Sequence, residues 1–234
     1  MKLLLINDDG IHAPGLAALE RAVAGVGERI VVAPDRHLSG CGHQATTHRP
    51  LTLTQLGEQR HMLDGMPADC TRVGLCVLAP DVDWVLAGIN EGGNLGADVY
   101  LSGTVSAVRE AALLGKPGIA VSQYIKRAMP VDWEQAAGWT ARVVGEILSR
   151  TCPSSTYWNV NLPHLESGSP MPAIVDCPLD GNPLPVHYES VDGKLHYRGN
   201  YHDRARDTGS DVDTCFSGRI AVTSFSVRTI PAIS

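Results

Sequence analysis

Three polar segments of this 234-residue chain carry oxygen-bearing side chains that could bind one divalent cation. The first segment, 7–10 (NDDG), places the adjacent carboxylates of Asp8 and Asp9 directly after an apolar run. The second carries Ser39, and the third carries Asn90 after another apolar run. Carboxylate, hydroxyl and amide oxygens suit a hard cation such as Mg²⁺ or Mn²⁺, with waters completing its shell, and no Cys or His pair accompanies them to favour zinc. We therefore predict a cation site formed by these four residues.

Each of these segments also has an ordinary structural interpretation. An Asp-Asp-Gly sequence is by itself more often a turn than a metal site, Asn90 could cap a helix, and Ser39 followed by glycine is uninformative alone. The argument depends on their joint position at the ends of apolar strands, where a simple turn would not need two acids.

A second feature, the sequence Ser102-Gly103-Thr104 at the start of a predicted helix, could bind phosphate. A helix N-terminus presents free N–H groups and a partial positive charge, and glycine lets a ligand approach the backbone closely. Asn94 could add an amide donor. The alternative is that Ser102 or Thr104 only caps the helix. Because the net charge of the chain is −6, a cation and this helix end, rather than Lys or Arg, would neutralise an anionic substrate.

The elements that must position these residues alternate between strand and helix. Apolar runs predict strands, and apolar residues at helical spacing predict helices. The predicted helices are one that Pro14 opens and Gly25 and Gly27 close, and those at 67–78, 104–114 and 133–148. The predicted strands are 2–6, 29–33, 51–56, 84–89, 118–122, 158–163 and 219–227. This order favours a Rossmann-like α/β fold with a doubly wound, mostly parallel sheet, in which ligands bind at the carboxyl ends of the strands.

The region after Thr151 has a different character. Residues 164–185 are rich in proline and irregular, and Asp192-Gly193 between two alternating runs predicts a β-hairpin over 187–200. We expect one α/β domain over residues 1–234, with a β-rich arm at about 180–218.

Composition and charge exclude several classes of protein. With 19 basic and 25 acidic residues and no block of five like charges, the chain lacks the electrostatic footprint of a protein that binds a nucleic-acid duplex. No run of about 18 apolar residues predicts a membrane span, and the apolar run at the N-terminus is too short for a signal peptide. We therefore expect a cytoplasmic protein without membrane partners. The six cysteines include no Cys-x-x-Cys pair and are expected to be reduced thiols.

Longer segments around these residues resemble the survival protein SurE family. The specific signal is NDDG together with the distant GIN and SGTV segments, and the resemblance covers nearly the whole chain in the family's order. The matching segments are NDDGIHAPG (7–15), SGCG (39–42), GMPADC (65–70), GINEGGNLG (88–96), VYLSGTVSAVREAALLGKPGIAVS (99–122), WNVNLP (158–163) and GRIAVTSFSV (218–227).

The resemblance implies a metal-dependent 5′/3′-nucleotidase that hydrolyses nucleoside monophosphates with one Mg²⁺ or Mn²⁺ ion per subunit. It also implies a homodimer that exchanges its C-terminal arms and could pair further into a tetramer. The family's metal ligands fall on Asp8, Asp9, Ser39 and Asn90, and its phosphate-side residues fall on Asn94, Ser102, Gly103 and Thr104.

This sequence departs from the family pattern at three places. Met66 stands where the family usually has Thr, the last strand reads TSFSV instead of a Thr-Pro-Leu ending, and Leu101 stands where an aromatic residue or His is frequent. The first two lie away from the predicted metal site, whereas Leu101 and the short C-terminal tail could alter substrate preference or the contact between subunits.

Among the residues near the site, we expect Asp8 and Asp9 to be catalytic. Asp9 is favoured as the acceptor of a proton from attacking water, and a covalent aspartyl phosphate is the alternative. His12 and His43 could protonate the leaving oxygen, although a solvated loop histidine is the simpler interpretation.

Other assignments remain open or are disfavoured. Arg198, Arg204 and Arg206 could reach phosphate from a neighbouring subunit or could form a solvated run of charge. A catalytically silent nucleotide-binding or assembly module is the alternative function. A haloacid-dehalogenase-type phosphatase would need acids two positions apart, and a dinucleotide-binding oxidoreductase would need Gly-x-Gly-x-x-Gly after the first strand; neither pattern is present there.

Overall fold

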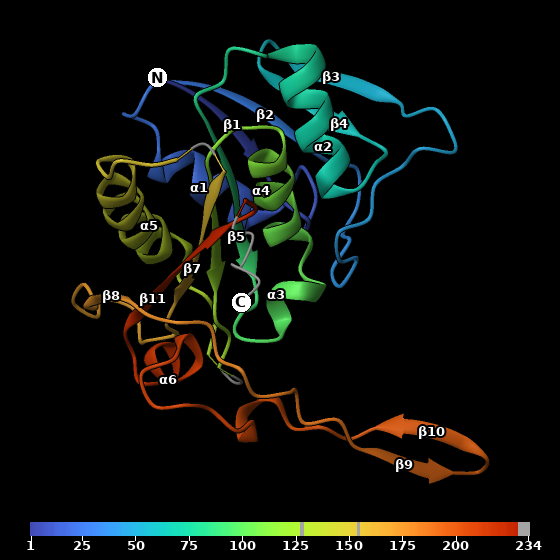
Figure 1. Cartoon of the computed structure of the whole chain (residues 1–234), viewed down its shortest axis with the longest axis vertical. Helices are drawn as coiled ribbons and strands as arrows, with labels where there is room; N and C mark the ends of the chain where they lie inside the picture. Colours follow the sequence, from blue (N-terminus) through green and yellow to red (C-terminus); the bar gives the residue numbers. More distant parts are fainter. Residues whose placement is uncertain (127–128, 154, 229–234) are drawn as a thin grey trace, which may run out of the picture.

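The computed structural model describes residues 1–126, 129–153 and 155–228, and its centre is a nine-stranded sheet (Figure 1). The strands are β1 (Lys2–Ile6), β2 (Glu28–Pro34), β3 (Leu53–Gly57), β4 (Arg60–Leu63), β5 (Trp84–Glu91), β6 (Gly118–Gln123), β7 (Thr156–Leu162), β8 (Ile174–Asp176) and β11 (Ile220–Ser226). Their order is β3-β4-β2-β1-β5-β6-β7-β11-β8. The pairs β3–β4 and β11–β7 are antiparallel, and the other neighbouring pairs are parallel. The predicted α/β fold with a mostly parallel sheet is confirmed.

Helices cover both faces of this sheet. They are α1 (Pro14–Ala22), α2 (Pro67–Val73), α3 (Asp98–Leu101), α4 (Gly103–Leu113), α5 (Trp133–Leu148) and α6 (Asp211–Phe216). Successive residues of a strand point to opposite faces, so Leu3 and Leu5 of β1 join one core with α1 and α5, while Leu4 and Ile6 join the other with α2 and α4. Figure 1 shows these helices on either side of the strands. Within the described residues, no helix has the length and apolar character needed to cross a membrane.

Helix α1 can lie against the middle of the sheet because its second residue is glycine. A Cβ atom on Gly15 would lie 1.9 Å from the carbonyl oxygen of Ile89 in β5, so no larger residue fits there. Pro14 occupies the first helical position, where a backbone N–H has no intrahelical partner in any case. This close approach holds α1 beside the strand that leads into the predicted site.

The sequence pattern misses the shortest elements and some element ends. The predicted exposed strand at 51–56 corresponds to β3, but β3 pairs with β4 as a hairpin that we did not predict. Helix α1 ends at Ala22, before the glycines expected to close it. The helix expected over 67–78 is α2 followed by a π-helical turn at Gly74–Leu78. The segments β8, α3 and α6 were also not predicted.

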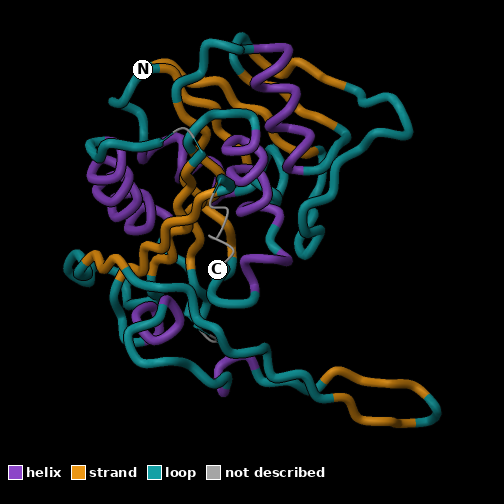
Figure 2. Tube along the Cα trace, in the orientation of Figure 1, coloured by secondary structure: helices purple, strands orange, loops and turns teal. Residues whose placement is uncertain are grey.

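A two-stranded hairpin, β9 (Tyr188–Val191) and β10 (Lys194–Tyr197), projects away from the body of the molecule (Figure 2). Asp192 and Gly193 form its turn with φ values of 51° and 73°, the left-handed conformation that a two-residue hairpin turn requires. The predicted hairpin is therefore confirmed. The chain then returns to the body through a 3₁₀ turn at Tyr201–Asp203 and through α6.

Candidate active site

A cavity of about 240 Å³ opens beyond the carboxyl ends of β1 and β5, the edge at which parallel α/β sheets bind their ligands. The residues that line it come from the loops after β1 and β2, from the end of β5 and the loop after it, from α3, and from the residue that caps α4. Five predicted site residues are among them: Asp8, Ser39, Asn90, Asn94 and Ser102. The fold thus brings separate polar segments of the sequence to one place.

The carboxylate of Asp8 is almost completely buried and is held at both oxygens by one residue of α4. The Thr104 hydroxyl donates to Oδ1 at 2.5 Å, and the Thr104 backbone N–H donates to Oδ2 at 3.1 Å. Gly103 permits this approach, because a Cβ atom there would lie 2.8 Å from Asp8 Oδ2. Burial raises the pKa of Asp8 to about 6, although the Thr104 hydrogen bonds act in the opposite direction. A nearby cation would favour the charged form of this carboxylate.

Asp9 lies next to Asp8 in the chain but has different partners. Its Oδ2 accepts a hydrogen bond from the backbone N–H of Glu91 at 3.1 Å, which ties the end of β1 to the end of β5. Its Oδ1 is buried and has no hydrogen-bond partner within the described residues, although Nδ1 of His37 lies 3.0 Å away. A buried carboxylate oxygen without a donor is destabilising, and a cation would satisfy it.

The two neutral ligands of the predicted cation site differ in exposure. Asn90 is buried, and its Nδ2 donates to the Gly92 carbonyl at 2.7 Å, which leaves Oδ1 as the atom available to a ligand. Ser39 lies on an exposed loop that two backbone hydrogen bonds attach to the site. The Leu38 N–H donates to the Asp8 carbonyl at 2.7 Å, and further along the loop the Gly42 N–H donates to the Leu101 carbonyl at 2.9 Å.

The donor set fits a hard divalent cation. No Lys or Arg of the described chain lines the cavity, so the side chains around it carry only negative charge. The described residues contain no group of three or more His, Cys, Asp or Glu side chains that could hold a metal ion. A mixed set of two carboxylates, a hydroxyl and an amide would need waters to complete the shell, which Mg²⁺ readily retains. Asp9 itself lines an adjoining hollow, which shares Glu91 and Gly92 with the cavity, and its Oδ1 accepts no hydrogen bond within the described residues.

Asn94 is fixed by three polar side chains that we did not predict. Its Nδ2 donates to Ser122 Oγ at 2.8 Å, and its backbone N–H donates to Asn161 Oδ1 at 2.8 Å. Its carbonyl accepts from Nδ2 of Asn159 at 2.7 Å and of Asn161 at 3.0 Å. Two asparagines in the middle of a buried strand would be destabilising without hydrogen-bond partners. Their presence in the apolar segment WNVNLP is therefore the sequence signal that could have identified Asn159 and Asn161.

The start of α4 offers donors to an anion in the cavity. Ser102 caps the helix by accepting from the Val105 N–H at 3.0 Å, so its own hydroxyl proton remains available. Both donors of Thr104 are directed to Asp8, so in this structure Thr104 holds a carboxylate. The roles of Gly103 and Thr104 at the phosphate stay predictions.

His43 is not a free loop histidine. Its Nδ1 accepts from Arg109 Nε at 2.9 Å, so its proton lies on Nε2, which donates to the buried Glu110 at 2.7 Å. Arg72 donates to the same carboxylate at 2.6 Å. The solvated interpretation of His43 is therefore wrong, and both of its ring nitrogens are already engaged. His12, in contrast, is exposed.

The arginines of the arm have different environments. Arg198 pairs with Glu189 at 2.9 Å on the exposed hairpin. Arg204 is fully buried and donates at 2.9 Å to Asp98, a residue that lines the cavity. The interpretation of Arg204 as part of a solvated run of charge is therefore wrong, because Arg204 is buried and holds a cavity residue of its own chain.

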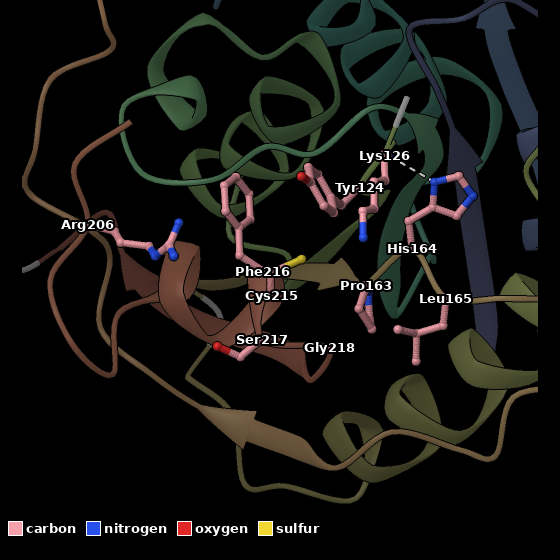
Figure 3. Close-up of a pocket in the computed structure, with 10 residues that line it drawn as sticks. All are labelled: Tyr124, Lys126, Pro163, His164, Leu165, Arg206, Cys215, Phe216, Ser217 and Gly218. Atoms are coloured by element: carbon pink, nitrogen blue, oxygen red, sulfur yellow. Dashed lines mark hydrogen bonds between the residues drawn. The ribbon is translucent and has the colours of Figure 1, made fainter. Parts of the chain in front are cut away.

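Arg206 lines a second hollow, of about 370 Å³, beyond the ends of β6 and β7 (Figure 3). Lys126 and Phe216 line the same hollow, and the Arg206 guanidinium lies 5.4 Å from the centre of the Phe216 ring. The second hollow shares no lining residue with the cavity at Asp8. We therefore keep it separate from the candidate site.

The fold and the cavity together define a Rossmann-like α/β protein with oxygen ligands and a helix N-terminus at the carboxyl edge of its sheet. The family model of the survival protein SurE matches residues 3–175 of the chain. The chain therefore belongs to the survival protein SurE family, as its motifs lead us to expect.

Individual relatives extend this match over nearly the whole chain. A relative from Synechocystis sp. is 48% identical over 97% of this chain and 100% of its own length. The protein named 5′-nucleotidase SurE from Geobacter sulfurreducens is 39% identical over 95% of this chain and 87% of its own length. The crystal structure of the SurE protein from Aquifex aeolicus matches with a TM-score of 0.84 at 34% identity, covering 97% of this chain and 93% of that one.

Proposed function

We propose that this protein is a metal-dependent 5′/3′-nucleotidase that hydrolyses nucleoside monophosphates to nucleoside and inorganic phosphate. Relatives named 5′-nucleotidase SurE support a phosphomonoesterase of this kind. The observation that carries the proposal is the buried Asp8 carboxylate, held by Thr104 in a cavity that it shares with Asn94 and Ser102. A carboxylate would repel a phosphate bound in the same cavity, but a cation between the two would be attracted to both.

The residues that would hold this cation are Asp8, Asp9, Ser39 and Asn90, and the matching ions are Mg²⁺ and Mn²⁺. When bound, the ion supplies positive charge and Lewis acidity in a cavity whose described lining includes no Lys or Arg. The buried Oδ1 of Asp9, which accepts no hydrogen bond within the described residues, supports this assignment.

Donors at the other side of the cavity would bind the phosphate. The Ser102 hydroxyl and the backbone N–H of Gly103 would stabilise the charge on the equatorial oxygens in the transition state. Asn94 would add the Nδ2 hydrogen that it does not share with Ser122. Because this amide is held by buried partners, it would be positioned before the substrate arrives.

Asp9 is the better candidate to accept the proton of attacking water. Both oxygens of Asp8 already accept hydrogen bonds from Thr104, whereas Oδ1 of Asp9 accepts none within the described residues and lies 3.0 Å from Nδ1 of His37. The alternative is an attack by an Asp that forms a covalent aspartyl phosphate. Recovery of labelled phosphate on the protein during turnover would favour that alternative.

The proposed activity is tested by phosphate release from a panel of nucleoside 5′- and 3′-monophosphates, with Mn²⁺ or Mg²⁺ and with excess chelator. We expect release from at least one nucleotide, and we expect the chelator to abolish it. Nucleotide binding without release from any member of the panel would instead favour a catalytically silent binding module.

We also propose that the β9–β10 hairpin joins two copies of the chain into a dimer, which could pair into a tetramer. The hairpin exposes the apolar side chains of Tyr188, Val191, Leu195 and Tyr197. An isolated two-stranded hairpin is at best marginally stable in water, so burial against a second copy would stabilise it. Analytical ultracentrifugation of the full chain should detect the dimer, and a monomer at all accessible concentrations would contradict the proposal.

A further inference from the structure

Asp98 is an acidic residue of the cavity that neither the predicted cation site nor the predicted phosphate contacts include. It lies in α3 and lines the cavity together with Asp8, Asn94 and Ser102. Its side chain keeps 16% of its surface exposed. A carboxylate in this position repels a phosphate group, so we do not assign Asp98 to the phosphate contacts.

The hydrogen bonds that hold Asp98 all fall on one of its two oxygens. Oδ2 accepts from the Tyr201 hydroxyl at 2.6 Å, from Nη1 of Arg204 at 2.9 Å and from the Leu95 N–H at 3.3 Å. No donor within the described residues reaches Oδ1. Because the side chain is not fully enclosed, Oδ1 is the atom left to meet a ligand.

The two side-chain donors come from the base of the arm and fix the position of Asp98. The Arg204 side chain is 0% exposed, and its guanidinium lies 5.0 Å from the centre of the Tyr201 ring. Its Nε and Nη2 atoms have no hydrogen-bond partner in the part of the chain that the structure describes. Asp98 is therefore the charge partner of the buried Arg204 guanidinium, and this ion pair holds the Asp98 carboxylate in one orientation.

We propose that Oδ1 of Asp98 accepts a hydrogen bond from a ribose hydroxyl of the bound nucleotide and thereby determines sugar specificity. A carboxylate only accepts hydrogen bonds, and a phosphate dianion has no donor to offer it. The ribose hydroxyls are the donors closest to the phosphate in a nucleoside monophosphate. Dinucleotide-binding α/β proteins place an acidic residue against a ribose hydroxyl in the same way. This inference rests on the proposed nucleotidase function.

The first test compares substrates with the wild-type protein in Mn²⁺. The substrates are AMP, 2′-deoxy-AMP, 3′-deoxy-AMP and p-nitrophenyl phosphate, which has no sugar. We expect kcat/KM for at least one deoxynucleotide to be about ten- to a hundredfold below that for AMP, as for one lost hydrogen bond to a charged group. Equal values for the three nucleotides would overturn the sugar contact and leave the nucleotidase proposal intact. Phosphate release from none of the four substrates would refute the nucleotidase proposal itself.

The second test uses Asp98→Ala with Glu91→Ala as its matched control. Glu91 lines the same cavity, but its carboxylate forms no hydrogen bond within the described chain. Asp98→Ala should lower kcat/KM for AMP to the level of the discriminated deoxynucleotide and should not lower it for p-nitrophenyl phosphate. Glu91→Ala should keep the wild-type ratio between AMP and the deoxynucleotides.

A loss that is equal for AMP and p-nitrophenyl phosphate in Asp98→Ala would give Asp98 a purely structural role and overturn the inference. Loss of Mn²⁺ affinity in the same variant would make Asp98 a cation ligand and overturn it as well. If the variant does not fold, because Arg204 loses its charge partner, the substrate comparison with the wild-type protein decides alone.

Discussion

Replacing Thr104 by Val removes one hydroxyl and leaves a side chain of the same branched shape. The hydroxyl is the donor 2.5 Å from Oδ1 of the buried Asp8, whereas the backbone N–H at Oδ2 remains. Thr and Val have similar helix propensities, so the helix itself should be little affected. A hydrogen bond to a charged group contributes about 1.5–3 kcal/mol. We expect the metal-free variant to lose free energy of unfolding in that range.

The same change should weaken cation binding. The Thr104 hydrogen bonds lower the pKa of Asp8, so the loss of one of them should raise that pKa further above its present value of about 6. At neutral pH a cation would then have to displace a proton from more of the molecules, and Mn²⁺ affinity should fall most steeply on the acidic side of neutrality.

Thermal unfolding in chelator, followed by circular dichroism, measures the first effect, and calorimetric titration with Mn²⁺ measures the second. For a domain of this size the expected loss corresponds to a fall in Tm of about 3–12 °C. Thr104→Ser is the control, because it keeps the hydroxyl and should retain most of the Mn²⁺ affinity. If Thr104→Val unfolds at the wild-type Tm and binds Mn²⁺ with wild-type affinity, the proposed link between Thr104, Asp8 and the cation is refuted.

Two further predictions concern a glycine contact and a buried acid. Gly103→Ala should reduce Mn²⁺ affinity and phosphate release, because the new Cβ would lie 2.8 Å from Asp8 Oδ2, whereas Gly145→Ala in α5, with nothing within 4 Å, should raise Tm slightly. Wild-type activity in Gly103→Ala would contradict this. The hydrogen bond from His43 holds the pKa of Glu110 below its ordinary value of 4.5. The ionised Glu110 therefore stabilises the folded state fully above about pH 4.5, and this contribution to the free energy of unfolding is lost as the pH falls through the lower pKa of the folded state. Urea unfolding at several pH values should show this loss in the wild type and a smaller one in Glu110→Gln, and parallel pH profiles would count against it.

The order of the longer elements could be predicted because each shows its period locally. The predicted helix at 133–148 coincides with α5, and Asp132 caps it by accepting from two N–H groups of its first turn. The three residues of β8 and the six residues of α6 are too few to show a period. Strand β8 depends on pairing with β11, and α6 packs in part against β7, so both contacts involve residues distant in the sequence.

The site could be predicted as a set of strand-end residues but not as a network. Parallel strands end at one edge, so polar residues after β1 and β5 were expected to meet, and they do. The bond from Thr104 to Asp8 joins residues 96 positions apart, and that from Arg204 to Asp98 joins residues 106 positions apart. No local pattern reveals such pairs, so only the structure identifies Thr104 as a partner of the carboxylate and Arg204 as a buried residue.

Phosphate release from a nucleoside monophosphate by Asp8→Asn, measured beside the wild type in Mn²⁺ and in chelator, decides whether this cavity is the catalytic site. The Asn side chain keeps the shape of Asp8 and removes its charge, so the cation would lose a ligand while the fold remains. We expect wild-type release that requires Mn²⁺ and almost none from Asp8→Asn. Near-normal, Mn²⁺-dependent release by Asp8→Asn would contradict the assignment of the whole site.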